Sequence, residues 1–512
     1  MSRRWWLAGS SSRRRAPRTW PRNDAAIGVR AWRHIPEEAP CDLQQALATS
    51  FFGAHFADFV VAEVDADGLS RAPSRATLTV PQLTSASADD GDRWFSFTLC
   101  KKRKSSYGAL DLLGSAGRQC IITGQKDTWA ITAQRAFVTL EAAPALLDAF
   151  KRHLASLQGG QHARVWVSDL MPCAAPVTHH LANHFSVTLR GGCSDGLFTA
   201  DCLQRCYDEG AVNFFGAQRF GLGAHLAGRH LARGEPAEAI RVWLAVLRNT
   251  SRYPDHAEAL DLYLSAGDAH GAAQALASTL GRESGESPEH EVLQALAAGA
   301  SCSEAAQAVS NGRWEAFCRE AYWSWCWNVA AAFRLRRFGR QVVPGDLVWS
   351  NGNPRVVEPG EEGLFALHDV LLPWRRESAE RMQVHAHATG PLYEELLGRG
   401  LTLSPMPGFE KECIQPELPA LRQLMACLWR SSNTTEPYWV YRPLIVRPLF
   451  LRATTRPAVS RHDIIDFEVP SGILSQMQPL QDIMQAGPRV VLEDLRQEPG
   501  FARRRQEALG DV

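Results

Sequence analysis

Apolar and polar residues alternate in several short segments within the first two hundred residues of the chain. The pattern over residues 58–64, 94–99 and 183–190 is typical of strands with one buried face. Residues 120–122 are apolar and residues 130–138 contain many strand-favouring side chains, so both segments also predict strands. The first part of the chain therefore predicts a β-sheet.

The pattern changes after residue 225, where alanine and leucine dominate and predict helices. Three segments of the form Leu-x-x-Gly end at Gly234, Gly267 and Gly299, and each precedes an alanine-rich stretch. Their spacings of 33 and 32 residues are close to the period of tetratricopeptide repeats. The aromatic positions of that repeat are missing, so a helical repeat is one of two interpretations of this region.

Composition limits the class of protein. A chain of 512 residues with 45% apolar content is long enough for two or more domains, each with its own core. No segment approaches the ~20 apolar residues that a membrane-spanning helix needs, so no membrane partner is expected. The 55 basic residues balance the 55 acidic ones, and any affinity for nucleic acid must come from local patches. The 12 cysteines form no C-x2-C framework, which favours a reducing compartment and predicts no metal site.

The first 36 residues differ in composition from the rest of the chain. They contain nine arginines, from Arg3 to Arg33, but a single acidic residue, Asp24. Such a segment resembles an organellar transit peptide and predicts a mitochondrial location, with a nuclear or cytoplasmic one as the alternative. A basic arm that binds phosphates and a mis-assigned start codon are the other interpretations.

Two motifs contain the candidate chemistry. Residues 124–134 have the form G-x-K-D-x-x-A-x-T-x-Q, and residues 213–221 have the form N-F-F-G-x-Q-R-F-G. Taken singly, the first predicts only a surface turn and the second only core packing. As a pair, the two motifs resemble signature segments of the TruD family of pseudouridine synthases. The order of elements agrees with that family: D-F-x-V-x-E at residues 58–63, a strand that ends in lysines, a helix, and then G-x-K-D.

The resemblance implies an isomerase that converts RNA uridines in tRNA, rRNA or mRNA to pseudouridine. Asp127 is then the catalytic aspartate, as nucleophile or as base at the ribose, and Lys126 beside it favours the ionised carboxylate. The target base must be extruded into a pocket. RNA is the expected partner, no cofactor or metal is implied, and a monomer is expected.

The family's active-site lysine corresponds to Lys101 or Lys102, and Lys102 is the favoured candidate. Members commonly have K-x-N-x-[DN]-T here, whereas this chain has Lys102 to Ser106, with Ser105 and Ser106 as candidate helix caps. Phe215 is predicted to stack on the target uracil, while Phe220 is expected in the core. The remaining candidate substrate-binding residues are Lys126, Asn183, Asn213, Gln218 and Arg219, the last for a phosphate or a structural carboxylate.

The resemblance continues at residues 320–328, 343–348 and 369–373. Arg334, Arg336, Arg337 and Arg340 form a cationic group that suits a phosphate or a solvated helix end. Residues 441–446 and 464–470 predict strands that return to the catalytic sheet. The clearest departure is at residues 469–482, where the family's L-P-x-x-x-[YF]-A-T-x-x-x-R-E is absent. A catalytically impaired RNA-binding or ribosome-assembly factor is therefore the alternative function, and a helical-repeat scaffold with a relic domain is a third.

The predicted fold class is α+β. A catalytic domain with a curved, mainly antiparallel sheet is interrupted by an inserted TRUD-type α/β domain, in which the alanine-rich helices correspond to the helical insert of the larger eukaryotic branch. The predicted units are a basic extension at 1–40, the catalytic domain at 42–225 and 455–495, the inserted domain at 226–454 and a charged tail at 496–512.

Overall fold

The computed structural model describes most of the middle of the chain. The predicted extension at 1–40, Gln218 and the segment from 471 onward, including the charged tail, lie outside the described residues. Within the described part, no helix is long and apolar enough to cross a bilayer. The described residues are 59–64, 94–122, 126–128, 130–156, 164–176, 182–190, 210–216, 219–251, 254–280, 287–309, 312–350, 353–376, 414–429, 438–447, 450–456 and 462–470.

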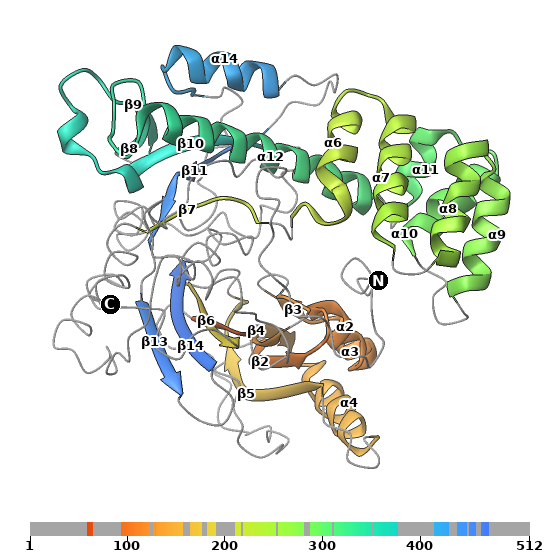
Figure 1. Ribbon diagram of the computed structural model, residues 1–512. Coiled ribbons are helices and arrows are strands. Elements are labelled where there is room, and N and C mark those ends of the chain that lie inside the picture. The colour runs from red at the N-terminus through yellow and green to blue at the C-terminus, as the bar shows by residue number, and fades with distance from the viewer. Residues whose placement is uncertain are drawn as a thin grey trace.

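An eight-stranded sheet forms the first unit, with the order β13-β14-β6-β1-β4-β2-β5 and β3 paired to β4. The β1–β4 pair is parallel, and the other neighbours are antiparallel. The predicted α+β fold with a mainly antiparallel sheet is confirmed (Figure 1). The strands are β1 (Phe59–Val64), β2 (Trp94–Lys102), β3 (Ile121–Ile122), β4 (Ile131–Thr139), β5 (Val165–Cys173), β6 (Ala182–Arg190), β13 (Phe450–Arg456) and β14 (His462–Pro470).

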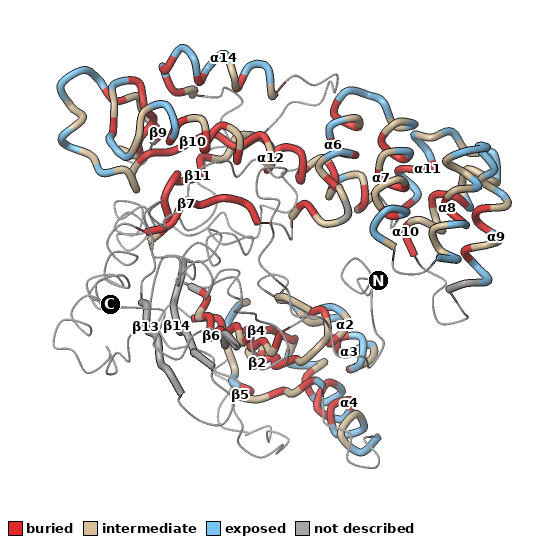
Figure 2. The backbone as a smooth tube through the Cα atoms, viewed as in Figure 1, coloured by how far each residue is buried: buried red, intermediate tan, exposed pale blue. Residues whose placement is uncertain are grey.

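Helices cover one face of this sheet. α2 (Ser106–Asp111), α3 (Gly114–Arg118) and α4 (Ala143–Ala155) pack their apolar sides on alternate residues of β2, such as Phe97 and Leu99. Both of those side chains have 0% exposure, as the alternating pattern predicts for an inward face. Figure 2 shows that much of β2 is buried.

A strand from late in the chain completes this sheet, because β14 pairs with β6 along its whole length. β13 begins at Phe450, before the predicted boundary at 455. The prediction that residues 441–446 return to the catalytic sheet is wrong. They fall instead in β11 (Tyr438–Pro443), which pairs with β10 (Val370–Arg376), and in β12 (Ile445–Val446), which pairs with β7 (Ala211–Val212). Alternation predicts a strand, but it does not specify the strand's partner.

The alanine-rich region forms three consecutive helical hairpins. Each glycine of the Leu-x-x-Gly segments has a positive φ, with 75° at Gly234, 72° at Gly267 and 90° at Gly299, and follows the first helix of its pair. Glycine is favoured there because a side chain would strain the left-handed backbone. The pairs are α6 (Ala224–Ala232) with α7 (Pro236–Thr250), α8 (Pro254–Ala266) with α9 (Ala269–Leu280), and α10 (Pro288–Ala297) with α11 (Cys302–Ala308).

A long helix, α12 (Arg313–Phe338), connects the hairpins to a second sheet (Figure 1). It is apolar around most of its circumference, and Trp314, Trp323 and Trp327 each have 0% exposure. The four-stranded sheet has the order β11-β10-β8-β9, and α12 packs against α6, β10 and α14. The elements not yet bounded are β8 (Leu347–Ser350), β9 (Asn353–Val356), α14 (Pro419–Leu428), η2 (Gly221–Gly223), η3 (Glu362–Leu364) and η4 (Leu367–Asp369).

Arg334, near the end of α12, is not available to bind phosphate as one interpretation of the sequence predicted. Arg334 is fully buried, and its Nε and Nη2 donate to the two carboxylate oxygens of Asp346 at 2.7 and 2.5 Å. It also donates to the carbonyls of Gly339 and Gln341. Arg334 therefore anchors the chain after the helix, because its spacing on α12 points it inward, whereas Arg336 and Arg337 are exposed.

Candidate active site

Asp127 lies in the turn between β3 and β4, as the G-x-K-D motif predicts. The residue before it is held through its backbone, because the amide of Lys126 donates to Ser106 Oγ at 3.0 Å. Ser106 Oγ in turn donates to Gln134 Oε1 at 2.6 Å. Ser105 caps α2 by accepting from the amide of Gly108 at 2.9 Å, so its predicted capping role is confirmed. The start of α2 thus fixes Ser106 beside the turn.

Lys101 fixes the other side of the turn. Its Nζ donates to the backbone carbonyl of Asp127 at 2.7 Å and to that of Lys126 at 3.2 Å. The side chain is fully buried, and burial lowers the pKa of the Lys101 ammonium to about 7, with the Asp127 carboxylate opposing the shift. Lys101 rather than the favoured Lys102 therefore reaches the turn. Adjacent residues of a strand point to opposite faces, and Lys102 is half-buried.

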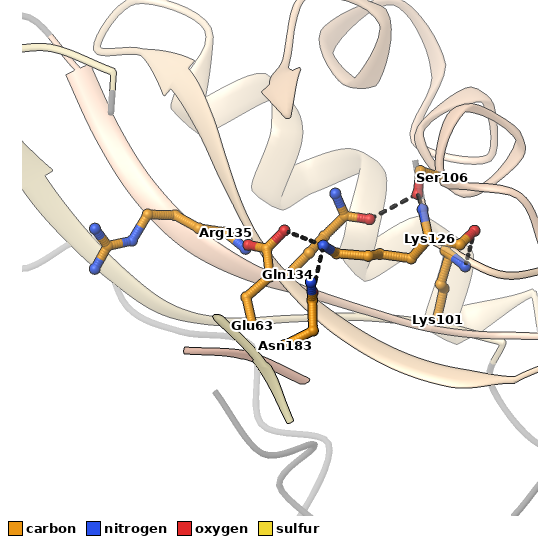
Figure 3. A network of polar contacts seen from close by, with 7 residues as sticks. All are labelled: Glu63, Lys101, Ser106, Lys126, Gln134, Arg135 and Asn183. Carbon is orange, nitrogen blue, oxygen red and sulfur yellow. Dashed lines mark hydrogen bonds and ion pairs between the residues drawn. The ribbon is translucent and has the colours of Figure 1, made fainter. Parts of the chain in front are cut away.

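A third contact to the turn involves the side chain of Lys126. Its Nζ lies 2.8 Å from Glu63 Oε1 and donates to Asn183 Oδ1 at 2.9 Å (Figure 3). Glu63 and Asn183 face each other in the β1–β6 register. Glu63 Oε2 also accepts from the backbone amide of Arg135 at 2.7 Å. Lys126 and Asn183, both predicted to bind substrate, thus have these polar groups engaged with other parts of the protein.

The second motif lies in a different part of the molecule. Asn213 is fully buried, its Nδ2 donates to the carbonyl of Pro443 at 3.2 Å, and Arg442 Nη2 donates to its Oδ1 at 2.6 Å. The amide of Phe215 donates to Asn328 Oδ1 at 2.8 Å, and Asn328 Nδ2 donates to the carbonyl of Phe215 at 2.9 Å. The motif therefore connects β11 and β12 to α12.

The ring of Phe215 is packed inside the same core. It has 0% exposure, lies edge-on to Trp327 at 5.8 Å between centroids and is 4.9 Å from Trp374. The guanidinium of Arg442 lies 4.0 Å from its centroid, a cation–π geometry. Core packing, the alternative set aside at the sequence level for Phe215, accounts for this ring as it does for Phe220.

The sequence left two possible partners for Arg219, a phosphate or a structural carboxylate. Its Nη1 lies 3.2 Å from Glu320 Oε2, and both side chains are largely buried. The guanidinium is also 5.7 Å from the Phe215 ring centroid. Arg219 thus binds a structural carboxylate on α12.

The chain is similar to proteins of one known family. A family model described as tRNA pseudouridine synthase D (TruD) matches residues 55–395, well over half of the chain. The chain belongs to the TruD family. A solved TruD structure from Methanosarcina mazei has the same fold, with a TM-score of 0.53 at 13% identity, and the match covers 90% of this chain and 97% of that one.

Two curated relatives that match this chain are eukaryotic, in agreement with the predicted resemblance. "Multisubstrate pseudouridine synthase 7" from Schizosaccharomyces pombe is 24% identical over 330 residues, which are 55% of this chain and 46% of that protein. "Pseudouridylate synthase PUS7L" from Homo sapiens is 24% identical over 340 residues, 59% of this chain and 45% of the relative. The chain thus spans less than half the length of these relatives.

Sequence reasoning missed two residues of the Asp127 group in this TruD chain. Glu63 and Ser106 both contact Lys126, but neither was predicted to be a catalytic or substrate-binding residue. The signal for Glu63 was present, because it is the one charged residue of β1 and has 1% exposure. A carboxylate in an apolar strand needs a partner, since an unpaired buried charge is strongly unfavourable.

Proposed function

We propose that this chain is an RNA pseudouridine synthase in which Asp127 is the catalytic residue. The reaction breaks the N1–C1′ bond of a uridine and joins C5 to C1′. The C5 proton is lost and N1 gains a proton, so no oxidant, reductant or cofactor is required. Membership of the TruD family supports the activity, and the observation that carries the role of Asp127 is the anchoring of its turn.

The anchoring suits a catalytic aspartate. Lys101 contacts the backbone carbonyl of Asp127, and Ser106 contacts the amide of the preceding residue. Both contacts fix the backbone at the residue that carries the carboxylate and at the residue before it. A carboxylate held in one place is an efficient nucleophile or base, because little positional freedom is lost when the reaction begins.

We infer that residues 102–107, from the end of β2 to the start of α2, contact the RNA strand. Lys102, Arg103 and Lys104 are half-buried cations, and Tyr107 is 51% exposed at the start of α2. Cations beside an exposed ring suit single-stranded RNA, in which phosphates are neutralised and bases stack. Ser106 connects this segment to the Asp127 turn, so a bound strand passes the candidate catalytic residue.

The substrate is proposed to be tRNA, rRNA or mRNA, in a mitochondrion. The location rests on the nine arginines in the first 36 residues. Imaging of a reporter fused to residues 1–40 tests it, because a diffuse signal would contradict a targeting role.

The function is tested by depletion and rescue. Pseudouridines are mapped in total and organellar RNA after depletion of the protein, and again after re-expression of the wild type or Asp127→Asn. Specific sites should disappear on depletion and return only with the wild type. No loss of sites, together with full rescue of growth by Asp127→Asn, would instead support the RNA-binding or ribosome-assembly alternative.

A further inference from the structure

Lys126 is held at every polar group of its backbone and side chain. Its amide donates to Ser106 Oγ, its carbonyl accepts from Lys101 Nζ, and its own Nζ contacts Glu63 and Asn183. These contacts come from α2, β2, β1 and β6, so four elements meet at the residue that immediately precedes Asp127 (Figure 3).

The pair of Lys126 and Glu63 is nearly dry. The exposed fractions of the two side chains are 9% and 1%. Glu63 is further compensated by the amide of Arg135, and the Lys126 ammonium by Asn183 Oδ1. Separation of the two side chains would leave each charge buried without its partner, which is strongly unfavourable. The pair is therefore held in one geometry.

This pairing argues against a role for Lys126 as a ligand of RNA phosphates. Its charge is already neutralised by a carboxylate 2.8 Å away, in a site from which water is largely excluded. A phosphate would have to displace Glu63, and the displaced carboxylate would remain buried without a counterion. What the pair does fix is the position of the turn relative to β1 and β6.

We propose that Glu63 and Asn183 are positioning residues that act through Lys126 to hold the Asp127 turn in its reactive place. The inference rests on the proposed function for its effect on rate. The effect on the backbone does not depend on that function, because the same contacts immobilise residues 126–128 whether or not the chain is a synthase. A displacement of about 1 Å at a reacting group lowers a rate about 100-fold.

The test compares Lys126→Met, Glu63→Gln and the double variant with the wild-type full chain. Each single variant should lower kcat about 10- to 100-fold, with little change in KM for RNA or in the dependence of RNA affinity on salt. The double variant should be no slower than the worse single one, because it leaves no unpaired charge. Lys126→Arg, which retains the cation, should recover part of kcat.

A matched control is available on α4. Lys151 and Asp148 form an exposed ion pair at 3.1 Å, and Lys151→Met should leave kcat unchanged. If Lys126→Met instead raises KM and weakens the salt dependence, Lys126 binds phosphate and the proposal is wrong.

Hydrogen exchange separates failure of this proposal from failure of the proposed function. The amides at residues 126–128 should exchange faster in Lys126→Met and Glu63→Gln than in the wild type and in Lys151→Met. This measurement needs no activity. Unchanged exchange at these amides would overturn the positioning role even if the chain is a synthase. Faster exchange in the two variants, together with no turnover by the wild type, would overturn only the activity.

Discussion

The ammonium of Lys101 donates to the backbone carbonyl of Asp127 at 2.7 Å from a fully buried position on β2. The contact joins a residue of the central sheet to the turn that holds the candidate catalytic carboxylate. Because it uses the carbonyl, it sets the position of the turn, and it also brings a titratable cation close to Asp127.

Lys101 should give the protein a characteristic dependence of stability on pH. Burial lowers its pKa from the ordinary 10.5 to about 7. Between these values the unfolded chain binds more protons than the folded one, so the free energy of unfolding should rise with pH, by up to about 1.4 kcal/mol per pH unit. Below pH 7 both states are protonated, and this contribution is constant.

Urea unfolding at pH 7, 8 and 9 measures that slope. Lys101→Met should remove the contribution of the amine and flatten the curve over this window. Equal slopes in the two proteins would show that the amine of Lys101 is not desolvated in the folded state.

Removal of one partner of the buried pair of Arg334 and Asp346 should be strongly destabilising. Asp346→Asn leaves the Arg334 guanidinium buried without its counterion and should lower the free energy of unfolding by about 3–5 kcal/mol. Glu361→Gln is the control, because the pair of Glu361 with Arg355 is about one-third exposed and should contribute far less. Similar losses in the two variants would contradict the structural role of Arg334.

The sequence predicted the strands better than it predicted the roles of individual side chains. Alternation located β1, β2 and β6 within a few residues, although β1 and the second half of β2 are buried on both faces. It could not distinguish Lys101 from Lys102, since the choice of face depends on which side the helices cover. The partner of residues 441–446 is likewise set by tertiary pairing.

The N-F-F-G motif shows a second limit of sequence reasoning. A motif marks residues that a family needs, but it does not separate substrate contacts from packing. Phe215 is surrounded by Trp327, Trp374 and Arg442, which come from three segments distant in sequence. No local pattern specifies such a cluster.

Phe215 should therefore affect stability. Phe215→Ala removes a fully buried ring and should lower the free energy of unfolding by roughly 3–5 kcal/mol, as measured by chemical denaturation. If the ring served only to stack on uracil, the variant would keep its stability and lose kcat/KM, and the core assignment would be wrong.

RNA affinity should depend on residues 102–107 and not on the helical hairpins. Residues 224–309 contain eleven acidic and six basic residues, a balance that repels phosphates. Lys102→Met should weaken binding and reduce the slope of log affinity against log salt by about 0.7, the single-strand value for one phosphate contact, and Tyr107→Ala should weaken binding without changing that slope.

Arg241→Met is the matched control for these variants, because Arg241 is an exposed cation of α7. It should leave both affinity and salt dependence unchanged in a filter-binding titration. If Arg241→Met lowered RNA affinity more than Lys102→Met, the hairpins rather than residues 102–107 would be the RNA-binding surface.

The most direct test of the catalytic assignment is release of tritium from RNA that contains uridine labelled at C5. Isomerisation expels the C5 proton, so the wild-type full chain incubated with labelled total RNA should release tritium. Asp127→Asn should bind the same RNA equally well and release tritium at least ~10³-fold more slowly. Release at the wild-type rate by Asp127→Asn would contradict the catalytic role of Asp127, and no release by the wild type would contradict the synthase activity.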